Sequence, residues 1–123
     1  MKNQDIITCF EGLANLREGS SMRFPARVSY AIARNIKLLQ PIVEDIQTAY
    51  NGLINQYAEP IEGDPTKFKV KENNITILNE EVTKLYNMET DVSLVKIKFS
   101  DIESLELSIK DTEALMLMIE EEN

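Results

Sequence analysis

The chain of 123 residues contains no histidine, no tryptophan and a single cysteine, Cys9. Without histidine, the Ser-His-Asp and Cys-His mechanisms of catalysis are excluded, and so are zinc sites built on histidine ligands. One cysteine cannot form an internal disulfide or a cysteine cluster. Because Cys9 lies in an apolar run, we expect it to be a buried thiol of low reactivity.

Glycine is also scarce, and four glycines at positions 12, 19, 52 and 63 match neither the dinucleotide-binding motif nor the P-loop. Paired carboxylates such as Glu44-Asp45 and Glu80-Glu81 lie on predicted polar faces, with no nucleophile or base beside them. Asp91 and Asp101 do not have the spacing of a calcium loop. We therefore predict a protein that is not an enzyme and has no metal site and no cofactor.

No hydrophobic run approaches the ~18 residues that a membrane-spanning helix needs. The first residues, Met-Lys-Asn-Gln-Asp, do not resemble a signal peptide. We expect a cytoplasmic protein that makes no contact with a membrane. Hydrophobic residues make up 43% of the chain, which is enough to pack the core of one domain.

The spacing of apolar residues predicts four helices. Apolar side chains recur every three or four positions over residues 3–16, 26–58, 73–87 and 109–121. From Val28 onward, the apolar positions of the longest helix fall within an arc of about 120°, which is typical of an amphipathic helix. Pro41 lies inside this helix and predicts a kink or a division, because proline has no N–H to donate.

Short strands are predicted where apolar and polar residues alternate. Residues 68–71 and 95–99 alternate in this way, with Val95, Ile97 and Phe99 expected to point inward. A further short strand is expected at 105–107. The sequence also predicts three features between these elements. They are a loop over 59–65 with its two prolines, a capped helical turn over 100–103, and a helix start at Ser108.

These elements predict an α+β fold: a long amphipathic helical hairpin with a small antiparallel β-sheet and a C-terminal helix. We expect residues 1–123 to form a single domain of three parts. Residues 1–22 form an N-terminal helix and linker, residues 23–88 the helical hairpin with a short strand, and residues 89–123 a strand-strand-helix unit.

Charge is divided unevenly along the chain. The formal net charge is −8, but residues 1–40 hold six basic against three acidic residues, and the remainder holds seven against eighteen. Because contacts to phosphates require clustered lysine and arginine, so acidic a chain is a poor general binder of nucleic acid. We expect no direct binding to nucleic acid.

All four arginines lie within the first 34 residues. Arg27, Tyr30, Arg34 and Lys37 share one face of the long helix, opposite its apolar stripe, and Arg23 adjoins them. Arginine recognises carboxylates and phosphates in a bidentate manner, and tyrosine with arginine is typical of binding hot spots. This face is either a solvated helix surface or a binding site. As a binding site it suits an acidic protein, a small anionic ligand such as a nucleotide, or the acidic half of another copy.

The last predicted helix has apolar residues around most of its circumference, since Leu115 is followed by Met116, Leu117, Met118 and Ile119. Such a helix is usually buried on more than one side. In so small a domain, the second buried side is either more core or a subunit interface. We expect a homo-oligomer.

Residues 23–35, 55–59 and 95–103 carry a resemblance to known proteins, with Glu113-Ala114-Leu115 further along. Over about residues 23–122 the chain resembles a group of small uncharacterised phage and prophage proteins of Gram-positive bacteria. The shared motifs are structural, so no site residue is transferred. The resemblance implies a phage accessory protein, most simply one for counter-defence, which blocks a bacterial immunity protein or sequesters its nucleotide signal. The alternative is a virion or phage-assembly accessory protein that acts through self-association.

Overall fold

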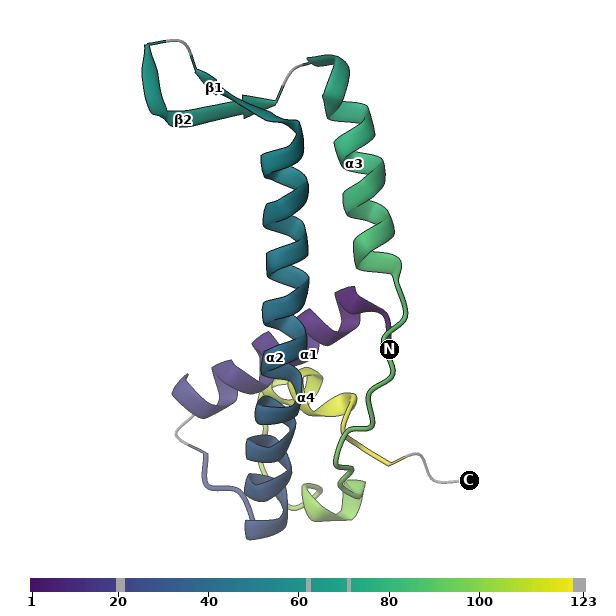
Figure 1. The fold of residues 1–123 in the computed structure, drawn as a ribbon. Coiled ribbons are helices and arrows are strands. Elements are labelled where there is room, and N and C mark those ends of the chain that lie inside the picture. Colours follow the sequence, from purple (N-terminus) through teal and green to yellow (C-terminus); the bar gives the residue numbers. More distant parts are fainter. Residues whose placement is uncertain (20–21, 62, 71, 121–123) are drawn as a thin grey trace.

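The computed structural model shows a mostly helical α+β fold, and the residues it describes are 1–19, 22–61, 63–70 and 72–120 (Figure 1). For 60–61 and 64–68 it describes the backbone only. The helices are α1 (Asn3–Gly19), α2 (Ala26–Tyr57), α3 (Glu72–Asn87) and α4 (Ile109–Met116). Two antiparallel strands, β1 (Ala58–Ile61) and β2 (Asp64–Val70), connect α2 to α3.

The core lies where α1 crosses α2 and where α4 packs against α1 (Figure 1). Its side chains come from α1, from α2 as far as Ile46, from α4 and Met118 after it, and from the irregular segment between α3 and α4. The fully buried apolar side chains include Ile6, Leu13, Val28, Leu39, Ile97, Leu115 and Met118. Buried residues recur every three or four positions along α1 and over residues 28–39 of α2, which explains why the sequence predicted these two helices.

The second half of α2 extends away from this core together with α3 and the two strands (Figure 1). We call residues 43–57, β1, β2 and α3 the arm. In the arm, Ile46 and Leu78 are the buried residues among the side chains that the structure describes. The ring centroids of Tyr50 in α2 and Tyr86 in α3 lie 6.2 Å apart. The arm is therefore held by fewer buried contacts than the core.

Helix α2 runs through Pro41 without a break, so of the two outcomes predicted for this proline, a kink or a division, the division is wrong. Its bounds otherwise agree with the predicted range of 26–58 to within one residue. Pro41 lies on the exposed side of the helix, so the carbonyl that loses its N–H donor is not confined to the core. The N-terminal helix ends at Gly19, which is later than the predicted Leu16.

Two buried asparagines attach the segment after α3 to the helices. Asn35 of α2 is fully buried; its Nδ2 donates to the Val95 carbonyl at 2.9 Å, and its Oδ1 accepts from the Val95 N–H at 2.7 Å. Asn3 of α1 is 4% exposed and donates to the Leu85 carbonyl at 2.8 Å. The Thr90 hydroxyl donates to Asn3 Oδ1 at 2.7 Å. These side-chain hydrogen bonds add to the two isolated backbone bridges of the segment, Lys2–Glu89 and Ile97–Ile119.

The predicted strands at 95–99 and 105–107 are wrong. Within 95–99 only Ile97 pairs, in an isolated parallel bridge with Ile119, and residues 105–107 form no strand. Ile97 donates to the Met118 carbonyl at 2.9 Å and accepts from the Glu120 N–H at 2.7 Å. Phe99 is 54% exposed and does not point inward, because the chain turns there into a 3₁₀ helix, Phe99–Asp101.

The connections between elements and the ends of the last helix also differ in part from the sequence predictions. Residues 58–61 and 64–70 form the two strands, so the loop predicted over 59–65 is wrong for most of its length. The strand predicted over 68–71 is confirmed for residues 68–70, and residue 71 lies outside the described residues. The helical turn predicted over 100–103 begins at Phe99, with Asp101 Oδ2 accepting from the Lys98 N–H at 2.9 Å. Helix α4 ends at Met116 and not at residue 121. The Ser108 cap is confirmed, since its hydroxyl oxygen accepts from the Asp111 N–H at 3.1 Å.

Two helical glycines provide a test of local packing. Gly52 is exposed in α2, and nothing lies within 4 Å of a Cβ added there. We expect Gly52→Ala to raise the free energy of unfolding by about 0.5–1 kcal/mol, because alanine loses less backbone entropy in a helix. Gly12 in α1 is the control, since its added Cβ would lie 3.2 Å from the Ala114 Cβ. In urea unfolding, Gly12→Ala should show no such gain; an equal gain would mean that α1 and α4 are loosely packed.

Candidate functional site

The five predicted site residues all lie at the surface, along the N-terminal half of α2. Arg23 precedes the helix, and the others lie on its solvent side; the Tyr30 side chain is 61% exposed. We call this set the basic face: Arg23, Arg27, Tyr30, Arg34 and Lys37. Val28, Ile32 and Leu39 point the other way, into the core. The α2 residues of the basic face therefore share one side of one continuous helix, as the spacing predicted.

The electrostatics of the basic face follow directly from the sequence around it. Residues 19–43 contain four basic residues and no carboxylate. Among the described residues, no carboxylate lies within ion-pair distance of Arg23, Arg34 or Lys37. Cations without partners on one part of the surface raise its positive potential, which attracts anions. The face therefore suits an anionic surface or a small anion.

Arg27 has a partner that the sequence did not reveal. Its Nη1 lies 3.8 Å from Asp101 Oδ1, and the Asp101 side chain is 19% exposed against 70% for Arg27. Asp101 also holds the 3₁₀ turn through the Lys98 N–H. An ion pair this exposed contributes about 0–1 kcal/mol, so a partner with a better-placed anion can displace it. The exposed Phe99 comes from the same turn as Asp101 and adds an apolar neighbour.

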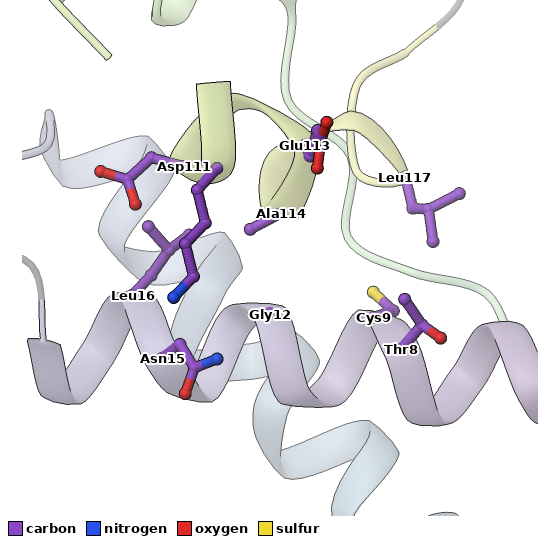
Figure 2. Close-up of a pocket in the computed structure, with 10 residues that line it drawn as sticks. Thr8, Cys9, Gly12, Asn15, Leu16, Asp111, Glu113, Ala114 and Leu117 are labelled. Atoms are coloured by element: carbon purple, nitrogen blue, oxygen red, sulfur yellow. The ribbon is translucent and has the colours of Figure 1, made fainter. Parts of the chain in front are cut away.

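A second candidate is the cleft between α1 and α4 (Figure 2). Figure 2 shows Cys9, Gly12 and Asn15 on the α1 side of this cleft, with Ala114 and Leu117 on the other side. Its volume is about 180 Å³. Small-molecule sites usually measure about 300–1,000 Å³, so the cleft is small for a cofactor or metabolite.

The chemistry of this cleft is also limited. The Thr8 hydroxyl donates to the Gln4 carbonyl of its own helix at 3.0 Å. Cys9 is 2% exposed, and burial raises the pKa of its thiol, an effect that the charge of Lys96 partly opposes. A raised pKa keeps the sulfur protonated near neutral pH, where a thiol is a poor nucleophile. The basic face is therefore the stronger candidate site.

The burial of Cys9 leads to a direct prediction. In the folded protein at pH 8, we expect iodoacetamide to modify Cys9 at least about tenfold more slowly than in urea, because only the exposed thiolate reacts. Mass spectrometry of the intact protein over time measures both rates. Equal rates would mean that Cys9 is accessible and that the cleft opens in solution.

Comparison with known proteins adds no relative. No family model matches the chain, and no curated protein or solved structure is similar to it. Within the part of the chain that the structure describes, no group of three cysteine or carboxylate side chains is placed to hold a metal ion. In the same part, no helix is both long enough and apolar enough to cross a membrane.

Proposed function

We propose that this chain is a non-enzymatic phage accessory protein that acts in the host cytoplasm by binding, through its basic face. The observation that supports this most is the set of exposed side chains on α2, in which cations surround Tyr30 and no carboxylate occurs from residue 19 to residue 43. The long helix and α3 form a helical hairpin in this proposal, and the core holds the N-terminal half of α2 rigidly behind the basic face.

The chemistry of the face favours an anionic partner with some apolar surface. Guanidinium groups bind carboxylates and phosphates with two hydrogen bonds, and the Tyr30 ring adds a flat apolar contact. An acidic patch of a host protein or a small nucleotide has these properties. Extended nucleic acid does not fit, because a net charge of −8 repels the phosphates beyond the face. We therefore propose counter-defence: the chain blocks a bacterial immunity protein or sequesters its nucleotide signal.

The test is the plating efficiency of a phage on a Gram-positive host that carries an immunity system signalling through a nucleotide. Expression of the chain should raise plating, and the double variant Arg27→Ala/Arg34→Ala should lose this effect by about tenfold or more, because removing two charged contacts costs at least ~1.4 kcal/mol of binding.

The matched control is Lys2→Ala/Lys110→Ala, which removes two exposed positive charges elsewhere. This control should keep the wild-type effect. Equal plating with both double variants, at equal protein levels, would show that the basic face is not the binding site. Titration calorimetry with cyclic dinucleotides distinguishes a nucleotide ligand from a host protein.

A second candidate function is a virion or assembly accessory protein that acts through self-association. The observation that favours it is a reversal of charge along α2. Residues 26–40 carry Arg27, Arg34 and Lys37 with no acid, whereas residues 41–57 carry Glu44 and Asp45 with no base. One helix thus presents two complementary surfaces.

A further inference from the structure

The solvent side of α2 is an uncovered surface that runs from the core to the end of the arm. Positions 27, 30, 34, 37 and 41 follow the spacing of three and four residues, positions 48 and 55 continue the same face at intervals of seven, and all are exposed. Leu38 is 40% exposed near the middle of this surface, next to the exposed Pro41. The surface is therefore a continuous helix face with an apolar centre.

One oppositely charged pair lies symmetrically about Pro41, whereas the positions that match Arg34 and Arg27 hold the uncharged Thr48 and Asn55. Lys37 lies four residues before Pro41, and Asp45 lies four residues after it, next to Glu44. Tyr30 lies eleven residues before Pro41, and Gly52 lies eleven residues after it. A second α2 helix that runs antiparallel to the first and is centred on Pro41 would therefore place Lys37 opposite the carboxylates. It would also place the Tyr30 ring opposite Gly52.

We infer that the basic face binds a second copy of this chain, with the two α2 helices antiparallel and a two-fold axis near Pro41. Two-fold pairing uses the same surface on both copies, so each favourable contact occurs twice. Lys37 of one copy faces Glu44 and Asp45 of the other, and Tyr30 lies over Gly52, where nothing stands within 4 Å of an added Cβ. This inference rests on the proposed function, since it takes the basic face as the binding surface.

The composition of the interface determines its strength. Exposed ion pairs contribute about 0.2–1 kcal/mol each and are screened by salt. The apolar centre is small, because Leu38, Pro41 and Tyr30 supply most of it. The dimer is therefore weak and sensitive to salt. An acidic host partner competes with the second copy for the same face, so binding of that partner separates the dimer.

Sedimentation velocity tests the inference through charge reversal. At low salt, the wild type should sediment as about 28 kDa, twice the 14.0 kDa of one chain. The variants Arg34→Glu/Lys37→Glu and Glu44→Lys/Asp45→Lys should each sediment as monomers, because like charges then face each other. An equimolar mixture of the two should restore the dimer. Raising sodium chloride from 50 to 300 mM should weaken the wild-type dimer by about tenfold.

The control is Glu80→Lys/Glu81→Lys, which reverses two carboxylates on α3, away from this face. This variant should dimerise like the wild type, and circular dichroism verifies that every variant is folded. A wild type that is monomeric at low salt, or a mixture that stays monomeric, would overturn the inference. If phage plating still depends on Arg27 and Arg34 in that case, the proposed function stands and only the second copy is wrong.

Discussion

Replacement of Leu39 by alanine is expected to lower the free energy of unfolding by about 2–5 kcal/mol. Leu39 lies in α2 and is fully buried in the cluster that α1, α2 and α4 form. Truncation removes apolar contacts and leaves a cavity that a well-packed interior cannot fully close. For a protein of this size, such a loss is a large part of the total stability.

Urea unfolding followed by circular dichroism measures this effect, and the neighbouring residue provides the control. Leu38 is 40% exposed on the other side of the same helix. Leu38→Ala should cost less than about 1 kcal/mol, because it removes little buried surface. A loss for Leu38→Ala as large as for Leu39→Ala would mean that α2 is rotated relative to the core described above.

Asn35→Ala is the second substitution with a large expected effect. Both backbone groups of Val95 depend on the Asn35 side chain, through hydrogen bonds of 2.9 and 2.7 Å. Alanine at this buried position leaves a carbonyl and an N–H without partners, and each costs about 1–3 kcal/mol. We expect a loss of about 2–5 kcal/mol, together with faster amide exchange at residues 94–97.

The matched control for this prediction is Asn55→Ala, which is an exposed asparagine of the same helix. It should change stability by less than about 0.5 kcal/mol. Hydrogen exchange read by mass spectrometry locates the effect. An Asn35→Ala variant with wild-type stability and unchanged exchange at 94–97 would show that Val95 has other partners in solution.

The helices of this fold were predicted well because each is indicated by the pattern of its own residues. The apolar positions of α1, α2 and α3 repeat at helical spacing over several turns, so the core-facing side could be read without knowing what packs there. Ser108 gave the start of α4 for the same reason, since a cap is a local interaction. Helical propensity and burial agree in these segments.

The strands were predicted poorly because pairing is not a local property. Alternation at 95–99 indicated a strand, but the neighbour of this segment is a buried asparagine of α2 and one bridge to Ile119. The pairing of residues 58–61 with 64–70 was missed because two prolines there indicated a loop. Burial alternates both in a strand and in an irregular extended segment. Only the partner of the segment decides which of the two forms.

The candidate site was predictable in part. The positions of Arg27, Tyr30, Arg34 and Lys37 on one side of α2 followed from the angle per residue alone. Asp101 was not predictable as a partner of Arg27, because the two residues lie far apart in the sequence. The exposure of Phe99 was missed because the turn predicted over 100–103 begins one residue earlier, at Phe99 itself.

The central claim is that the basic face of α2 makes the functional contacts, and photo-cross-linking in infected cells tests it most directly. Photoreactive benzoylphenylalanine is placed at Tyr30, where an exposed aromatic ring already stands, and separately at Thr76, which is exposed on α3. Position 30 should yield a covalent adduct with a host protein or a second copy, and position 76 should yield none. Adducts from position 76 with none from position 30 would contradict the claim.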